Sequence, residues 1–119
     1  MTRPTHRELS NKIKQAIKAV ENGNILLLNM VSLVSDADEL GYVIEDDITT
    51  LLIELLKNSN PDNYAGSRPP QRSYQQNIQG AELFAFVVGE TTLKKSVYFK
   101  FSIVEEMLYL ISLHRDRKK

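Results

Sequence analysis

The stretch "SVYFKFSIVEEMLYLISLH", residues 96–114, decides the fold. It is rich in aromatic and β-branched residues and is interrupted by two glutamates, so it predicts two strands joined by a tight turn. A shorter run of the same kind, "AELFAFVVG", covers residues 81–89. Together the runs predict an antiparallel meander in the C-terminal part of the chain.

The turn between the last two strands determines which side chains share a face of the sheet. A two-residue turn at Glu105 and Glu106 favours Gly or Asn at positive φ, and the sequence offers neither. We therefore expect a three-residue loop from Glu105 to Met107, which pairs Val104 with Leu108. Because side chains alternate along a strand, this one-residue choice fixes the position of every later side chain.

In this register Tyr98 lies opposite His114, and Lys100 lies opposite Ser112. The polar face that results is expected to carry Tyr98, Lys100, Ser102, Leu110, Ser112 and His114. The other face is expected to be core and to carry Val97, Phe99, Phe101, Ile103, Tyr109, Ile111 and Leu113. A plain solvated face and a site for proton transfer beside a phosphate both fit this polar cluster.

The N-terminal half reads as helical. Thr5 and Glu8 form a capping-box pattern ahead of an apolar stripe at helical spacing, and Gly23 supplies a left-handed stop. Residues 45–58 form a second strong amphipathic helix. Its buried face is expected to carry Ile48, Leu51, Leu52, Leu55 and Leu56.

The residues between the two helices are less regular. Residues 24–34 are apolar without a clear period, which fits a short strand that runs into a helix. A short helical turn follows, with Ser35 and Asp36 as candidate caps and Gly41 as its terminator.

These elements predict one domain of the α+β class, in which two main N-terminal helices pack on a small C-terminal antiparallel sheet. A chain of 119 residues is long enough to bury a single core. We divide it into a helical half (5–58), a long loop (59–80), the antiparallel sheet (81–114) and a basic tail (115–119). A loop of this length is usually functional or disordered.

Composition excludes several classes of site. There is no cysteine and there are only two histidines, so we expect no disulfide, no structural zinc site and no cofactor. No apolar run approaches a membrane span and the start lacks the apolar stretch of a signal peptide, so we expect an intracellular, cytoplasmic protein. Net charge is zero, but residues 21–64 carry one cation and nine anions. Such segregation fits either a local phosphate-binding surface elsewhere or ordinary surface variation.

Three segments in this order resemble the motility quorum-sensing regulator (MqsR) toxins: "RPTHRELSNKIKQAIKAVENG", "SLVSDADELGY" and "SVYFKFSIVEEMLYLISLH". The resemblance spans nearly the whole chain, and the middle loop matches least. It implies a RelE-like fold and a sequence-selective endoribonuclease that cuts mRNA without metal or ribosome. It also implies a cognate antitoxin that silences the toxin.

The resemblance carries over to individual residues unevenly. Lys100 matches the lysine of the family's Val-Tyr-x-Lys strand, His114 falls where the family has a catalytic lysine, and Tyr64 matches a loop tyrosine. Two positions depart from the pattern. Ala65 stands where a lysine is expected, and Ala81 stands near an expected glutamine, with Gln79 as the nearest substitute.

Metal-free RNA cleavage needs a base, an acid and fixed positive charge. We assign His114 to proton transfer and Lys100 to phosphate stabilisation, with Tyr64 as a third catalytic candidate. The candidate RNA-binding residues are Tyr98, Arg68, Arg72, Arg115 and Arg117. The expected partners are single-stranded mRNA and an antitoxin, and a homodimer is a further candidate. The alternative is a non-catalytic interaction module that binds a protein through its acidic residues 36–54 or an exposed strand edge.

Overall fold

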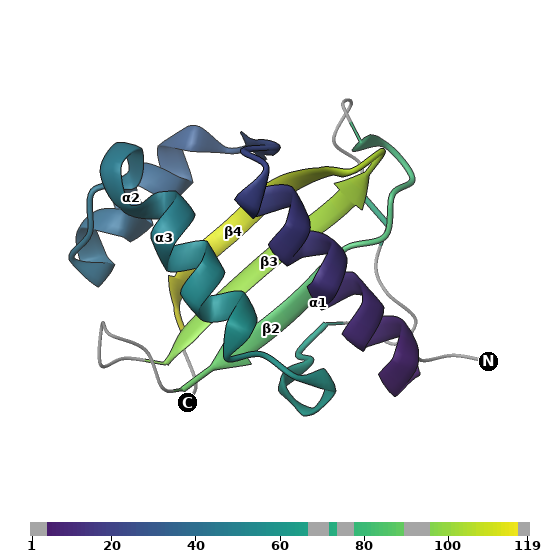
Figure 1. Ribbon diagram of the computed structural model, residues 1–119. Coiled ribbons are helices and arrows are strands. Elements are labelled where there is room, and N and C mark those ends of the chain that lie inside the picture. Colours follow the sequence, from purple (N-terminus) through teal and green to yellow (C-terminus); the bar gives the residue numbers. More distant parts are fainter. Residues whose placement is uncertain (1–4, 67–71, 74–77, 90–95, 117–119) are drawn as a thin grey trace.

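The computed structural model describes residues 5–66, 72–73, 78–89 and 96–116. Three helices precede most of the strands, as the α+β class requires (Figure 1). In chain order the elements are α1 (His6–Glu21), β1 (Ile25–Leu27), α2 (Met30–Leu40), α3 (Ile44–Lys57), the 3-10 helix η1 (Pro61–Asn63), β2 (Phe84–Val88), β3 (Val97–Val104) and β4 (Met107–Arg115).

Helix α1 begins and ends where the sequence predicts. The Thr5 hydroxyl accepts from the Glu8 backbone N–H, and the Glu8 carboxylate accepts from the Thr5 N–H, which completes the capping box. Past the other end, Gly23 adopts φ +76°, the left-handed conformation that glycine allows without strain. The predicted stripe of α1 is buried, with Leu9, Ile13 and Val20 in the core.

The predicted faces of the other helices are partly confirmed. In α3, Leu51, Leu52, Leu55 and Leu56 are buried, and Ile48 packs beside them. The short strand and following helix are confirmed as β1 and α2. The expected caps at residues 35 and 36 are wrong, because α2 already begins at Met30 and these residues lie inside it. Gly41 does end α2, at φ +86°.

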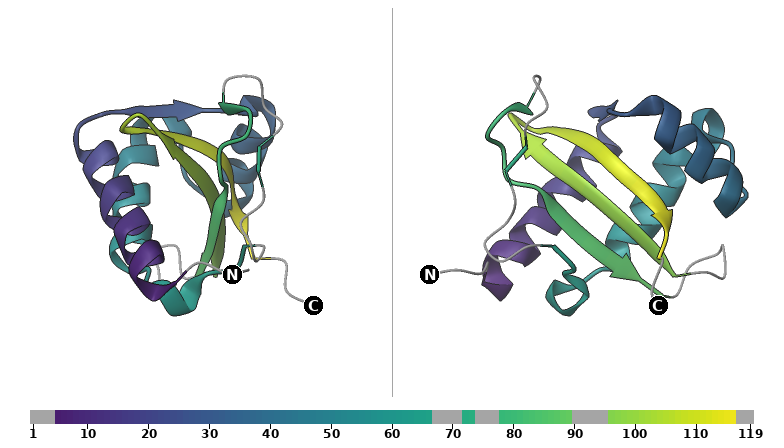
Figure 2. Two further views of the ribbon diagram at one scale, coloured as in Figure 1. Left: turned by 90° about the vertical axis from the view of Figure 1, so that its right-hand side faces the viewer. Right: turned by 180° about the vertical axis from the view of Figure 1, so that it is seen from behind.

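The sheet is mixed rather than purely antiparallel. Its strand order is β1-β4-β3-β2. Strands β2, β3 and β4 form the predicted antiparallel meander, whereas β1, from the helical half of the chain, pairs in parallel with the first half of β4. Helices α1 and α3 lie on one face of this sheet, and α2 lies alongside β4 (Figure 2).

The turn between β3 and β4 corrects the predicted loop. Val104 pairs with Met107, so the turn holds two residues, Glu105 and Glu106. Both adopt positive φ, at 50° and 67°, which is the combination a type I′ hairpin turn requires. The three-residue loop was therefore wrong, and two glutamates occupy a conformation that Gly and Asn usually fill.

A β-bulge in β4 restores the predicted pairing farther along the hairpin. Phe101 pairs with Leu110, but Lys100 pairs with Ser112, so Ile111 is an extra residue in β4. Beyond the bulge Tyr98 lies opposite His114, as expected.

The bulge also divides the predicted faces. Leu113 is in the core as predicted, whereas Leu110, which was placed on the polar face, is fully buried in the core beside the helices. Tyr109 and Ile111, which were placed in that core, lie instead with a second apolar cluster. The predicted faces of β4 are therefore right only beyond the bulge, whereas Phe101 and Ile103 of β3 face the main core as predicted on the turn side of it.

Two apolar clusters of unequal size cover the two faces of the sheet. The face turned to α1 and α3 holds the main core, in which Phe86 stacks on Phe99 and Phe101 at centroid distances of 5.9 and 6.0 Å. The opposite face holds a small cluster around Ile78, Leu83 and Ile111. This second face is covered near the β3–β4 turn and carries polar side chains toward the other end of the strands.

Candidate functional site

Tyr98 and His114 form a stacked pair on the second face of the sheet. Their ring centroids lie 4.8 Å apart and their planes differ by 16°. The neighbours Phe99 and Leu113 point into the main core, so strand alternation turns Tyr98 and His114 away from α1 and α3. Both rings are half-buried. The stack therefore holds the imidazole in a defined orientation at an accessible surface.

A backbone contact selects the tautomer of the neutral His114 ring. Its Nδ1 lies 2.8 Å from the carbonyl oxygen of Arg115. Because a carbonyl oxygen only accepts hydrogen bonds, Nδ1 carries the hydrogen and donates. In neutral His114 the lone pair is then on Nε2, the nitrogen that can take a proton from a substrate.

Lys100 and Ser112 continue the same face. They pair with each other two residues along each strand from the stacked rings, and both are half-exposed. Diagonal neighbours in an antiparallel pair lie about 7–8 Å apart, within reach of a long side chain. An ammonium, a hydroxyl and an imidazole thus share one patch of the sheet, as the sequence predicts.

Burial raises the pKa of the Tyr98 phenol above its usual 10.0. Removal of water from around the hydroxyl disfavours the phenolate, so Tyr98 stays protonated at neutral pH. Its hydroxyl is available as a hydrogen-bond donor, and its ring supports the imidazole.

Two open grooves flank the stacked pair. The Tyr98 groove, of about 510 Å³, is lined by Asp62, Asn63, Tyr64, Ala65, Val87, Tyr98 and Asp116. The His114 groove, of about 470 Å³, is lined by Val31, Ser32, Ser35, Asp36, Ser112 and His114. A third cavity of about 390 Å³ lies between the end of α1 and the β3–β4 turn and contains none of the predicted site residues.

Carboxylates line both grooves, which limits what the grooves can bind. Asp62 and Asp116 face the Tyr98 groove, and Asp36 faces the His114 groove. A carboxylate repels phosphate but accepts hydrogen bonds from hydroxyl and amino groups. A nucleic acid on this face would therefore place a phosphate at Lys100 and its sugars or bases in the grooves.

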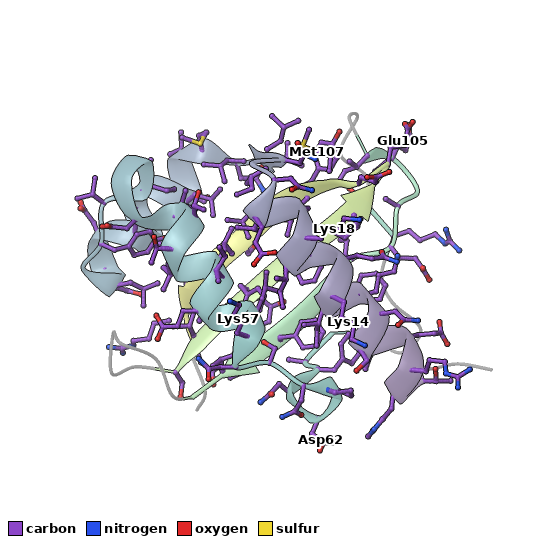
Figure 3. The ribbon with its side chains drawn as sticks, in the orientation of Figure 1. Lys14, Lys18, Lys57, Asp62, Glu105 and Met107 are labelled. Carbon is purple, nitrogen blue, oxygen red and sulfur yellow. The ribbon has the colours of Figure 1, made fainter. Side chains whose placement is uncertain are left out.

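The cations of α1 lie away from this patch. Lys14 and Lys18 project from the exposed side of α1, which covers the first face of the sheet (Figure 3). Figure 3 also shows Asp62 at η1, at a margin of the molecule. These two lysines therefore do not add to the charge of Lys100.

Tyr64 is held within the main core. Only 6% of it is exposed, and its ring meets Phe86 edge to face with centroids 5.8 Å apart. The Ala65 N–H donates to the Ala85 carbonyl, so this segment continues the sheet beyond β2. A Cβ at Gly66 would lie 2.7 Å from the Tyr64 hydroxyl oxygen, so a larger residue there would displace the Tyr64 ring. This packing gives Tyr64 a structural role, and its catalytic role stays a prediction.

The two predicted arginines that the structure describes, Arg72 and Arg115, differ in their distance from the stacked pair along the fold. Arg72 is exposed and donates to the Gly80 carbonyl at 2.9 Å, in the loop that covers the other end of the second face. Arg115 follows His114 directly and is exposed. Arg68 and Arg117 lie outside the described residues.

The residues that depart from the toxin pattern have clear positions. Ala65 lines the Tyr98 groove, where its methyl group brings no charge. Ala81 packs against the second apolar cluster, and Gln79 is exposed in the loop beside it. Neither Ala81 nor Gln79 lines a groove beside the stacked rings.

Sequence reasoning missed the groove walls. Ser32, Ser35 and Asp36 come from α2, whereas Asp62 and Asp116 come from η1 and the residue after β4. No local pattern links these segments, because the parallel pairing of β1 with β4 is what brings α2 beside His114. Among the described residues no group of three His, Cys, Asp or Glu side chains is arranged to hold a metal ion. None of the described helices is both long and apolar enough to span a membrane.

No family model matches the chain, and a search of curated proteins finds no match. The resemblance to the MqsR toxins therefore stays a prediction from the sequence.

Proposed function

We propose that this chain is a metal-independent endoribonuclease that cuts single-stranded mRNA at selected sequences. The observation that carries the proposal is the Tyr98–His114 stack, with Nδ1 fixed by a backbone carbonyl and Lys100 on the same open face. The imidazole is oriented, its Nε2 is the basic nitrogen, and a cation lies within reach. They supply the base and the fixed positive charge that transesterification of RNA requires, and water supplies the acid.

The reaction follows from these groups. Nε2 of neutral His114 takes the proton of a ribose 2′-hydroxyl, and the freed oxygen attacks the adjacent phosphorus. The bond from phosphorus to the 5′-oxygen breaks, and that oxygen takes a proton from water. The products are a 2′,3′-cyclic phosphate and a 5′-hydroxyl end. Lys100 stabilises the extra negative charge of the phosphorane, and the grooves hold the neighbouring sugars and bases.

The toxin resemblance adds two parts to this proposal. The enzyme acts in the cytoplasm, where its mRNA substrate is, and a cognate antitoxin protein silences it. Both parts rest on the three matching segments of sequence.

The test uses purified protein and a defined RNA, without ribosomes and in the presence of EDTA, with the cut ends mapped. Wild type should leave 5′-hydroxyl ends at discrete positions. His114→Ala should lower the rate by about 10²–10⁴-fold, the usual contribution of a general base. Lys100→Met should lower it by about 10²-fold through the lost charge.

The matched control is Lys18→Met, which removes the same charge as Lys100→Met. Lys18 is exposed on α1, on the other side of the sheet, and lines neither groove. Its loss should leave the rate unchanged. Cleavage that survives His114→Ala would refute the site, and intact RNA with folded wild type would refute the enzyme.

A second candidate function is a protein-interaction module built on the same fold. The carboxylates Asp36, Asp62 and Asp116 favour it, because they place negative charge beside the patch where RNA would bind. A module of this kind would bind a basic protein surface. Intact RNA together with salt-sensitive binding of an antitoxin candidate would support this alternative.

A further inference from the structure

The segment Asn22–Ser35 contains no charged residue, although 25% of the chain is charged. It forms β1 and the first half of α2. Four of its apolar side chains are exposed, and we refer to them as the β1–α2 patch: Leu26 (45% exposed), Met30 (45%), Val31 (87%) and Val34 (46%). A surface that is both apolar and uncharged is typical of a contact with another protein.

Strand β1 also presents an open edge. It is an edge strand of the sheet, whose order is β1-β4-β3-β2. The Leu28 N–H donates to the Leu110 carbonyl, and the Asn24 carbonyl accepts from the Leu108 N–H. Because these groups alternate along a strand, the N–H and C=O groups of Ile25 and Leu27 point away from β4.

The two edges of the sheet are treated differently. Beyond β2, the segment Tyr64–Ala65 covers the edge through a bridge to Phe86 and a bond to Ala85. Beyond β1 the sheet order shows no further strand in the described part of the chain. Proteins usually protect a free edge with charged side chains, and the residues of β1 supply none.

We propose that a second copy of this chain docks on the β1–α2 patch, with the two β1 strands antiparallel across a two-fold axis. A two-fold axis at Leu26 would pair Ile25 with Leu27 of the other copy, so that the outward N–H and C=O groups of each β1 edge bond to those of the other. The β1–α2 patch contains no charged side chain that would oppose this contact. An acidic or basic partner would find no opposite charge on it, which favours a second copy over a charged protein.

The docked copy would also border the candidate site. Val31 belongs to the β1–α2 patch, and it lines the His114 groove together with Ser32 and Ser35. A second copy on the patch therefore adds a wall to the groove beside His114. The inference concerns assembly and stands whether or not the chain cuts RNA.

Sedimentation of the full chain over a range of concentrations tests the proposal. Wild type should change from monomer to dimer within the micromolar range. Val31→Lys and Leu26→Lys should each weaken the dimer by about tenfold or more, because each would place a charge in an apolar contact.

The matched control is Val43→Lys, since Val43 is also an exposed valine (57%) but lies past the far end of α2. It should leave the dimer unchanged. Circular dichroism checks that each variant is folded. A wild type that stays monomeric to about 100 μM, a range in which a specific dimer would form, would overturn the proposal. So would a dimer that both patch substitutions leave intact, since that dimer uses another surface.

Discussion

The two faces of the sheet differ in how much of the stability they carry. The face under α1 and α3 holds three stacked phenylalanines with no exposed surface. The second face has only a small apolar cluster near the β3–β4 turn and leaves Tyr98, Lys100 and His114 partly open. One face can therefore stabilise the fold, which frees the other to carry polar groups that contribute little to folding.

The largest effect is expected on the helix-covered face. Phe99→Ala removes a fully buried ring from the stack and leaves a cavity, so it should lower the free energy of unfolding by about 3–5 kcal/mol. Lys100→Ala, on the next residue but the opposite face, should change it by less than about 0.5 kcal/mol. Urea unfolding of both variants measures the contrast. Similar losses would show that the second face also carries the fold.

An intermediate effect is expected at the bulge. Ile111→Ala empties the centre of the smaller cluster around Ile78 and Leu83, and should cost about 2 kcal/mol, the low end for such a truncation. Urea unfolding of this variant measures the loss in the free energy of unfolding. A loss as large as that of Phe99→Ala would mean that the second cluster is equal to the main core.

The smallest effect is expected at Tyr42, at the margin of the main core. Its buried hydroxyl has no hydrogen-bond partner among the described residues, so Tyr42→Phe should raise the free energy of unfolding by about 1 kcal/mol at neutral pH. Burial, and then the charge of Asp36, raise the Tyr42 pKa from 10.0 to about 12.

This pKa shift also predicts how the stability of the fold depends on pH. The unfolded chain releases the Tyr42 proton near pH 10, whereas the folded chain holds it until about pH 12. Ionisation of Tyr42 therefore leaves the free energy of unfolding unchanged below pH 10 and lowers it as the pH rises from 10 to 12. The Tm measured from pH 8 to 12 should fall less steeply for Tyr42→Phe than for wild type. Parallel curves would contradict the burial of this hydroxyl.

Local patterns in the sequence were enough to predict the helices. The capping box at Thr5, the stop at Gly23 and the leucine face of α3 depend only on residues a few positions apart. The parallel pairing of β1 with β4 was not predictable in this way. A three-residue strand, Ile25–Leu27, joins residues 108–110 from the other end of the chain, and no short-range signal records that contact.

The candidate site was predicted in part, and by an argument with two errors that cancel. The expected loop at Glu105 was one residue too long, and the bulge at Ile111 was missed. Each shifts the register by one, so the pairing of Tyr98 with His114 came out as predicted. The grooves could not be predicted, because their walls come from segments that only the folded chain brings together.

The bulge gives β4 two opposite patterns of tolerance to mutation. Before Ile111 the even-numbered Leu108 and Leu110 are fully buried, and beyond it the odd-numbered Leu113 is. In a complete substitution scan of the strand, the sensitive positions should therefore fall on even numbers first and on odd numbers later. Aligned relatives that lack the extra residue would show one unbroken alternation, and the point where the alternation breaks would locate the bulge without a structure.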